Sequence, residues 1–317
     1  MDKDKDPQSP WAQARPRTGK AARPERASGA GRSEPDERAR AHIDGRDANA
    51  RPSRPRASTD TARAPGGPSQ AQPAREQRLY GLNACLAAFA RRPDALRKVY
   101  LVESRMGALK AVLAWCVQRR IGYRVVEAED LDKLTASRHH EGVCFDLQRP
   151  EPLTLNALLA AQPEAPAPSL LLWLDGVGNP HNLGALLRSA AHFGVAGVIV
   201  PTGAALDVSG AAARVAEGAA EIVPLIQAAA GPALRELRAH GYLFAGTVPR
   251  EGMSPYATVL PSRLVLVLGA EGEGMSGAMI ENADLRLTIP GSGAIESLNV
   301  AASVAVLLGE YWRQLHA

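Results

Sequence analysis

The second half of the chain alternates continuous apolar runs with amphipathic segments, and this alternation restricts the fold more than any other feature. The run LVLVLG (264–269) is apolar throughout, as is typical of a strand buried on both faces of a sheet. LLLWLD (170–175) has the same character, and helical spacing of apolar residues follows at 182–194. The pattern predicts an α/β domain with a doubly wound parallel sheet over residues 169–317.

The other elements of this half follow from the same periodicities. Strands are expected at 195–201, 220–226, 242–248 and 284–290, and helices near 208–219, at 231–241 and at 297–316. One apolar stripe runs along the last helix, formed by Val300, Val304, Leu307, Leu308, Tyr311 and Leu315. The stripe belongs either to the core of the same domain or to a contact with a second copy.

Residues 78–148 repeat the alternation on a smaller scale. Helices are expected at 79–92, 107–120 and 129–137, and strands at 98–104, 123–128 and 142–148. This order predicts a small α/β domain with a parallel or mixed sheet. Residues 149–168 contain five prolines and are predicted to be a linker, with one short apolar stretch at 153–160.

Residues 1–77 have the composition of a disordered arm. Residues 1–78 hold 17 Lys and Arg against 11 Asp and Glu, a net charge of +6, whereas the rest of the chain has −2. Large apolar side chains are almost absent there, so the segment cannot bury enough surface to offset the entropy of ordering. Two interpretations stay open, an electrostatic tether for nucleic acid and a passive solvated extension.

Composition also excludes several classes of protein. No stretch approaches the roughly 18 consecutive apolar residues of a membrane span, and the N-terminus lacks the apolar run of a secretory signal. Cys85, Cys116 and Cys144 are an odd number without a CxxC spacing, which argues against a disulfide framework and a zinc site. We expect a soluble cytoplasmic protein with buried cysteines and no metal.

Three segments carry more glycine and polar residues than packing requires, and the first is 174–194. A strand ends at Asp175, a Gly/Asn/Pro loop follows, and Asn182 is expected to cap the next helix. Arg188 lies nearly two turns further on, so Asn182 and Arg188 can both address one end of a site. An isolated arginine in a surface ion pair is the alternative.

A dinucleotide-binding fingerprint fails in this segment. Gly176 and Gly178 match the first two glycines of G-x-G-x-x-G, but His181 occupies the third position. A nicotinamide-dependent enzyme is therefore disfavoured.

The second segment, 264–276, runs from a buried strand into a loop with Gly269, Gly272 and Gly274. Glu271 and Glu273 lie between these glycines, so the loop suits a cationic or donor-rich ligand better than a phosphate. A simple hairpin-like turn is the alternative.

In the third segment, 288–303, a Pro/Gly loop places Ser297 and Asn299 at the start of the last helix. Ser297 is a possible N-cap, whereas Asn299 is expected inside the first turn, where asparagine is unfavourable. The three segments together predict one crevice at the carboxyl edge of the sheet, where open α/β sheets bind ligands.

NPHNLGALLRSA, LVLGAEGEGM and IPGSGAIESLNV, in this order, resemble the three signature motifs of the SpoU (TrmH-like) family of the SPOUT superfamily. This resemblance implies an S-adenosylmethionine-dependent methyltransferase that acts on ribose 2′-hydroxyls of ribosomal or transfer RNA. It also implies a trefoil-knotted catalytic domain, in place of the unknotted sheet that the pattern alone suggests. Residues 78–148 are similar to the ribosomal-protein-like RNA substrate-binding domain that precedes the catalytic domain in many members.

The resemblance also assigns site residues. It places Gly269, Ile289 and Leu298 on the cofactor, with Glu271, Gly272, Gly274 and Ser297 in the same loops. The expected catalytic set is Asn182, Arg188, Glu271, Ser297 and Asn299. Ala301 stands where members usually have serine, and His181, Gly178 and the stretch EGAA at 217–220 mark a divergent subfamily.

In the family the arginine that corresponds to Arg188 is proposed as the general base. Because a guanidinium normally keeps its proton, phosphate anchoring and stabilisation of the forming alkoxide are equally good accounts. Asn182 and Ser297 are expected to orient Arg188 and the ribose, and Asn299 to support the loop. The family also forms homodimers, and exposed Tyr311 and Trp312 are expected at that contact.

Two other functions stay open at this point. One is a catalytically silent RNA-binding or ribosome-associated protein with the same fold, and the other is methylation of a base in place of ribose.

Overall fold

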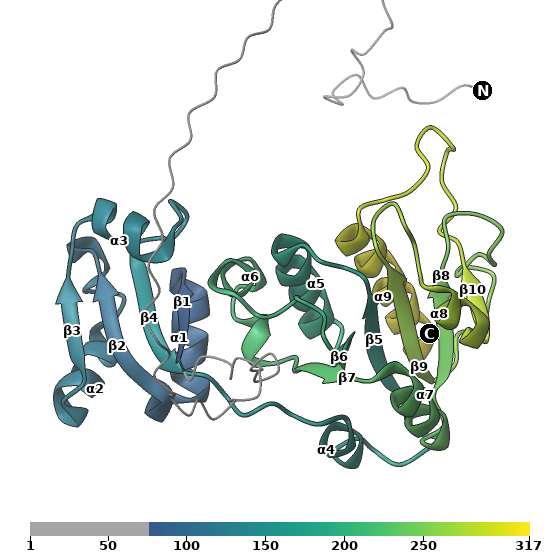
Figure 1. Cartoon of the computed structure of the whole chain (residues 1–317), viewed down its shortest axis with the longest axis horizontal. Coiled ribbons are helices and arrows are strands. Elements are labelled where there is room, and N and C mark those ends of the chain that lie inside the picture. Colours follow the sequence, from purple (N-terminus) through teal and green to yellow (C-terminus); the bar gives the residue numbers. More distant parts are fainter. Residues whose placement is uncertain (1–75) are drawn as a thin grey trace, which may run out of the picture. The chain divides into compact units, whose positions relative to one another are not determined.

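The computed structural model describes residues 76–317 (Figure 1). The predicted arm lies outside the described residues except for its last two positions. A four-stranded mixed sheet comes first, with the strand order β1-β4-β2-β3 and only β2 and β3 parallel. Its strands are β1 (Glu76–Tyr80), β2 (Leu96–Leu101), β3 (Gly122–Val125) and β4 (Val143–Gln148).

Helices α1 (Leu82–Arg91) and α2 (Lys110–Arg119) cover one face of this sheet, and α3 (Ala128–Thr135) packs on the other. Two short 3-10 turns, η1 (Pro93–Ala95) and η2 (Glu103–Arg105), flank β2. The mixed sheet confirms the small α/β domain. The expected helix at 79–92 is corrected, because Leu79 and Tyr80 belong to β1, a strand that the sequence did not reveal.

All three cysteines are free and buried, as expected. Burial raises the pKa of each thiol, that of Cys144 to about 12. The thiols therefore stay protonated and behave as small core side chains.

The second sheet has six parallel strands in the order β10-β8-β9-β5-β6-β7. The strands are β5 (Ser169–Asp175), β6 (Gly197–Pro201), β7 (Leu225–Ala228), β8 (Leu243–Thr247), β9 (Arg263–Gly269) and β10 (Leu285–Leu287). The two continuous apolar runs, β5 and β9, are neighbours at its centre. This agrees with the expectation of strands buried on both faces. The predicted trefoil knot is not tested by the strand order and stays a prediction.

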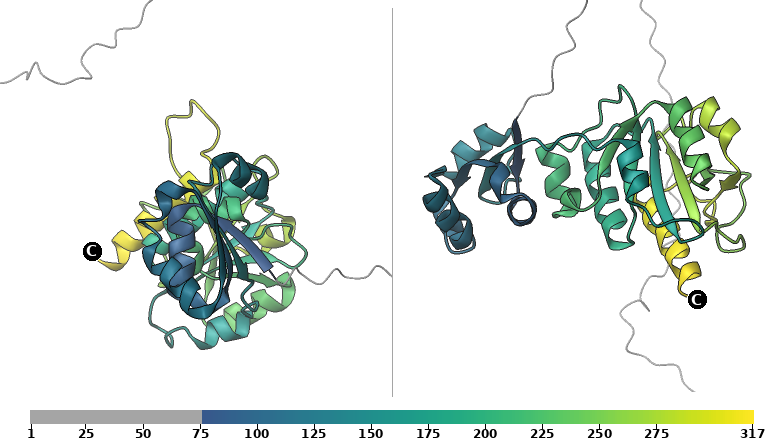
Figure 2. Two further views of the ribbon diagram at one scale, coloured as in Figure 1. Left: turned by 90° about the vertical axis from the view of Figure 1, so that its left-hand side faces the viewer. Right: turned by 90° about the horizontal axis from the view of Figure 1, so that it is seen from below.

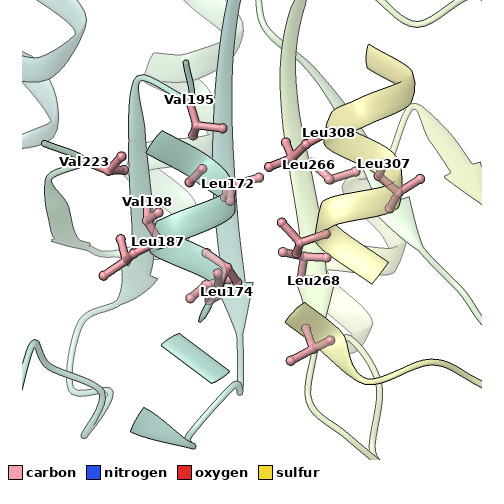
Figure 3. Packing of buried hydrophobic residues seen from close by; sticks show 14 of the residues in the cluster. Leu172, Leu174, Leu187, Val195, Val198, Val223, Leu266, Leu268, Leu307 and Leu308 are labelled. Atoms are coloured by element: carbon pink, nitrogen blue, oxygen red, sulfur yellow. The ribbon is translucent and has the colours of Figure 1, made fainter. Parts of the chain in front are cut away.

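Helices cover both faces of the six-stranded sheet (Figure 2). They are α4 (Leu155–Ala160), α5 (Pro180–His192), α6 (Gly210–Ala216), α7 (Ala230–Ala239), α8 (Gly277–Asn282) and α9 (Val300–Leu315), with a 3-10 turn η3 (Ala219–Glu221) after α6. Leu172 of β5 faces the core that contains α5 and α9, whereas Trp173 faces α4, α7 and α8. Figure 3 shows the first of these cores, where leucines of β5 and β9 meet α5 and α9.

The apolar stripe of α9 belongs to this core. Val304 and Leu308 are fully buried, and Leu307 and Val300 nearly so. The expectation that Tyr311 is exposed is wrong, because its ring is buried and its hydroxyl donates to the backbone oxygen of Ser262. The stripe is therefore intramolecular packing, and only the end of the helix leaves apolar surface uncovered.

Three further expectations are corrected by local hydrogen bonding. Helix α5 begins at Pro180 with Asn179 as its N-cap, so Asn182 lies inside the first turn. Asn299, expected inside the last helix, is instead the N-cap of α9 and accepts a hydrogen bond from the Ala301 amide. The segment expected as a strand at 220–226 begins with η3, and β7 starts only at Leu225.

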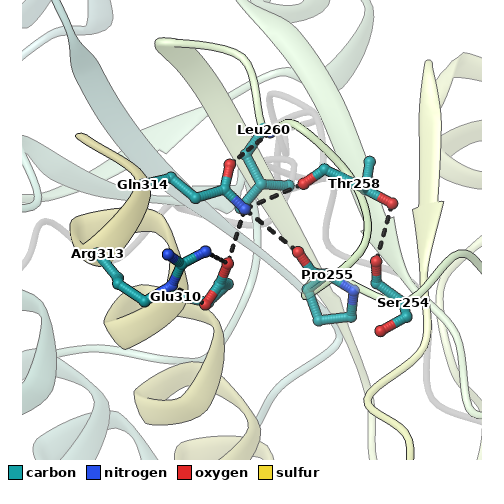
Figure 4. A network of polar contacts seen from close by, with 7 residues as sticks. All are labelled: Ser254, Pro255, Thr258, Leu260, Glu310, Arg313 and Gln314. Atoms are coloured by element: carbon teal, nitrogen blue, oxygen red, sulfur yellow. Dashed lines mark hydrogen bonds and ion pairs between the residues drawn. The ribbon is translucent and has the colours of Figure 1, made fainter. Parts of the chain in front are cut away.

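At its other end, α9 holds the loop between β8 and β9 (Figure 4). The Gln314 amide donates to the carbonyls of Pro255 and Thr258, and its oxygen accepts the amide N–H of Leu260. Glu310 is buried beside it and accepts hydrogen bonds from Gln314 and Arg313. Within residues 76–317 there is no helix with the length and apolar content that a bilayer span requires.

Candidate active site

The carboxyl ends of β5, β9 and β10 meet at one edge of the sheet, and side chains from all three motifs join there. The Asn182 amide of α5 donates to Glu271 Oε1 at 3.0 Å. The Asn299 amide donates to the same carboxylate oxygen at 3.0 Å and to Asn182 Oδ1 at 3.1 Å. We call Asn182, Glu271 and Asn299 the amide–carboxylate triad. The triad shows that side chains of all three motifs meet at this edge of the sheet, whereas the expected crevice stays a prediction.

The first glycine-rich loop is held in shape by its own backbone. Ala270 and Gly274 exchange two backbone hydrogen bonds of 2.9 Å, which close a hairpin-like turn around Glu271. A Cβ on Gly269 would lie 2.3 Å from the carbonyl carbon of Gly274, so only glycine permits this close approach. The loop is therefore a hairpin-like turn that carries Glu271 of the triad, and its role in ligand binding stays a prediction.

Asp175 fixes the other end of this loop. Its carboxylate accepts the backbone N–H of Ser276 at 2.6 Å, which ties the end of β5 to the start of α8. The sequence interpretation assigned Asp175 no role beyond ending a strand. The available signal was a carboxylate placed directly after a buried run, beside a second strand end.

The second glycine-rich loop, residues 290–299, is exposed along its whole length. Among its backbone N–H groups from Gly291 to Leu298, only that of Ala294 has a partner within residues 76–317. Ile295 and Leu298 expose large apolar surface, and Ile289 is half-buried at the base of the loop. The loop thus offers free backbone donors and apolar side chains next to the triad.

Arg188 and Ser297 lie apart from the triad in this structure. Arg188 is exposed, six residues beyond Asn182, which corresponds to about 9 Å along the axis of α5. It lines a cleft of about 490 Å³ together with His192 and with side chains of α1 and the α6–η3 segment. Ser297 is exposed in the second loop and makes no hydrogen bond through its side chain to any described residue. The sequence did not indicate this cleft.

The site has the chemistry of an organic-ligand site. Within residues 76–317 there is no group of three or more His, Cys, Asp or Glu side chains arranged to hold a metal ion. The site offers free backbone N–H groups, the exposed side chain of Leu298 and the Glu271 carboxylate. Together they fit a ligand with a flat aromatic face, hydrogen-bonding groups and positive charge. S-adenosylmethionine has these properties.

Comparison with known proteins matches both halves of the described region. The SpoU rRNA Methylase family model matches residues 169–309, and the model for RNA 2′-O ribose methyltransferase substrate binding matches residues 78–153. These matches confirm the resemblance seen in the motifs.

Two curated relatives show the extent of the similarity. The chain is 41% identical over 244 residues to the uncharacterized tRNA/rRNA methyltransferase YfiF of Escherichia coli O157:H7, covering 77% of this chain and 70% of that protein. It is 37% identical over 244 residues to the 23S rRNA (guanosine-2′-O-)-methyltransferase RlmB of Pasteurella multocida, covering 75% of this chain and 98% of that protein.

Solved structures share the fold. The SpoU methyltransferase AviRb of Streptomyces viridochromogenes, in complex with AdoMet, superposes with a TM-score of 0.64 at 21% identity, covering 77% of this chain and 92% of that chain. A structure described as an RNA 2′-O ribose methyltransferase gives a TM-score of 0.64 at 25% identity over 77% of this chain and 90% of that chain. The chain therefore belongs to the SpoU rRNA methylase family.

Proposed function

We propose that the protein transfers a methyl group from S-adenosylmethionine to a ribose 2′-hydroxyl of RNA. One observation carries this function: the amide–carboxylate triad joins Asn182, Glu271 and Asn299 across the three motifs that the family shares. A protein that only bound RNA would not need this arrangement beside a ligand loop. The relatives and the family models point to the same chemistry.

We assign the cofactor to the two glycine-rich loops. Gly269, Gly272 and Gly274 let the first loop approach it closely, with Glu271 in the turn. The second loop contributes Ile289, Ser297 and Leu298. When bound, S-adenosylmethionine supplies an electrophilic methyl group on a sulfonium centre.

The chain's own residues position the sugar hydroxyl. The reaction requires the oxygen nucleophile to lie about 3–3.5 Å from the methyl carbon and in line with the bond that breaks. Asn182 and Asn299 hold Glu271 through its Oε1 atom, and Oε2 accepts no hydrogen bond from residues 76–317. This second oxygen can accept a hydrogen bond from the ribose hydroxyl and then take up its proton.

Arg188 acts on charge in this proposal. Its guanidinium is exposed and makes no ion pair with any described residue, so it is available to an RNA phosphate. A guanidinium there also stabilises the negative charge that develops on the ribose oxygen. Both roles keep the proton on Arg188, in agreement with its chemistry.

We propose ribosomal RNA, and a guanosine within it, as the substrate, which would place the protein in the cytoplasm. The support is the guanosine-2′-O specificity in the names of relatives that are matched over almost their full length. Residues 78–148 would bind RNA, as the substrate-binding family model suggests.

We further propose a homodimer, supported by the exposed Trp312 and Leu315 at the end of α9, which light scattering would test.

The experiment uses purified full-length protein, tritiated S-adenosylmethionine and deproteinised ribosomal RNA. We expect the label to enter RNA and to appear in 2′-O-methylguanosine after nuclease digestion and mass spectrometry. Label in a methylated base would contradict ribose transfer. Binding of RNA without any transfer would support the catalytically silent alternative.

A further inference from the structure

Besides Arg188, the cleft contains the polar side chains of Asn83, His192 and Glu217, which the proposed methyl transfer does not use. Arg188 and His192 line it from one face of α5, one turn apart. Asn83 of α1 and Glu217, which follows α6, line it from the other elements. Three alanines and one isoleucine complete the lining, namely Ala191, Ala216, Ala219 and Ile222.

Glu217 is held in a fixed orientation. The Asn83 amide donates a hydrogen bond to Glu217 Oε2, whereas Oε1 has no partner among residues 76–317. Next to it, Gly218 lies against α1 so closely that a Cβ would be 2.8 Å from the Ala87 methyl. Arg92, which directly follows α1, donates two hydrogen bonds of 2.9 and 2.8 Å to the carboxylate of Glu221. The carboxylate is therefore preorganised, with one oxygen open to the cleft.

The backbone does not explain a glutamate at this position. Glu217 has a φ of 53°, in the left-handed region where glycine or asparagine is less strained. Its side chain must therefore be explained by what it contacts.

An ionised carboxylate can only accept hydrogen bonds, so the ligand of Glu217 must offer donors. Guanine presents two adjacent donors, N1–H and N2–H, on its Watson–Crick edge. Glu217 Oε1 can accept one of them, and the remaining lone pair of Oε2 can accept the other. Proteins read unpaired RNA bases by hydrogen bonds to this edge and by stacking on histidine rings or arginine planes. His192 supplies such a ring, and the positive charge of Arg188 reduces the repulsion between the Glu217 carboxylate and the RNA phosphates.

We propose that this cleft holds an unpaired guanine base of the RNA substrate and that Glu217, positioned by Asn83, recognises its Watson–Crick edge. The proposal rests on the proposed function and adds the residue that selects the base. Glu217 contacts the base directly, whereas Asn83 is a positioning residue that acts through Glu217. The small domain thereby contributes to the selection of the nucleotide.

The test measures binding of fluorescently labelled 11-nucleotide oligouridylates that carry one central guanosine, inosine or adenosine. Inosine lacks the N2 amino group, so it removes one donor without any change to the protein. We expect the wild-type protein to bind the guanosine oligonucleotide about tenfold more tightly than the inosine one, as for loss of one charge-assisted hydrogen bond. Glu217→Gln should reduce this preference to about twofold, and Asn83→Ala to an intermediate value.

Glu164→Gln is the matched control, because Glu164 is an exposed carboxylate between α4 and β5, outside the cleft and outside residues 78–148. It should keep the tenfold preference. Equal binding of the guanosine and inosine oligonucleotides by the wild-type protein would overturn the proposal, as would an unchanged preference in Glu217→Gln. Methyl transfer to ribosomal RNA is measured in parallel. Methyl transfer without a preference for guanosine would refute only the proposed role of the cleft, whereas absence of methyl transfer would refute the proposed function.

Discussion

The two ends of α9 carry polar clusters that differ in their surroundings. At the N-terminal end, Asn299 joins the amide–carboxylate triad, whose hydrogen bonds are exposed to solvent. At the C-terminal end, Glu310 is buried and Gln314 half-buried, and the two hold the loop between β8 and β9. Exposed amides add little to stability because water competes for them, whereas buried ones are costly to leave unpaired. The N-terminal end of α9 therefore contributes to the proposed active site, whereas the C-terminal end stabilises the fold.

Replacement of Arg188 should have the largest effect on activity and almost none on stability. Arg188→Ala removes the positive charge that we propose for the RNA phosphate and the forming ribose oxygen, and we expect the rate of methyl transfer to fall by about 100- to 1000-fold. The affinity for S-adenosylmethionine, measured by calorimetry, should stay the same. Arg188→Lys keeps the charge but not the planar fork and should recover part of the rate. A near wild-type rate in Arg188→Ala would remove Arg188 from the mechanism.

Gly269→Ala should damage the cofactor loop itself. The new methyl group would lie 2.3–2.6 Å from backbone atoms of Gly274 and Met275, so the turn must move. We expect affinity for S-adenosylmethionine to fall at least about tenfold, with a loss of about 1–3 kcal/mol in the free energy of unfolding. Gly277→Ala is the control, since a Cβ added there would meet no atom within 4 Å apart from its chain neighbours and the backbone of its own helix. Equal behaviour of the two variants would show that the close approach is unimportant.

Gln314→Ala tests the stabilising end of α9. The substitution leaves the carbonyls of Pro255 and Thr258 and the N–H of Leu260 without their partner. We expect the free energy of unfolding in urea to fall by about 2 kcal/mol. Methyl transfer per folded molecule should stay within about twofold of the wild type. A fall in rate without a fall in stability would reverse the assignment of the two ends.

The smallest effect is a pH dependence at Glu310. Hydrogen bonds from Arg313 and then Gln314 lower the pKa of this carboxyl from 4.5 to about 2. A folded-state pKa below the unfolded value stabilises the protein above about pH 4.5, and this stabilisation is lost as the pH falls toward 2. Thermal unfolding of wild type and Glu310→Gln should therefore differ most near neutral pH and converge in acid. A constant difference would argue against the ionised pair.

The sequence predicted the elements whose signal is local. The apolar runs of β5 and β9 and the stripe along α9 are visible within a few residues, and the structure confirms them. Short elements such as β1 and α8 have too few residues for a periodicity to stand out. The cap positions were missed because Asn179 and Asn182 are equally plausible from residue type alone.

Contacts between residues far apart in the sequence were harder to predict. Asn182 lies 89 residues from Glu271 and 117 from Asn299, so no local pattern indicates that they touch. Their grouping came from the order of strands and from the resemblance to a family. The partners of Tyr311 and of Glu217 were not predicted, because each contact depends on segments that periodicity does not place together.

The most direct measurement is the methyl-transfer rate of Asn299→Ala on ribosomal RNA, normalised to the folded fraction. This substitution removes one of the two amide donors to Glu271, so the carboxylate is no longer held in its position. We predict a loss of at least about 100-fold, equivalent to about 2.7 kcal/mol of transition-state stabilisation. Because Asn299 also caps α9, the free energy of unfolding should fall by about 1 kcal/mol, and the normalisation to the folded fraction removes this effect from the rate. A rate within twofold of the wild type would contradict the account.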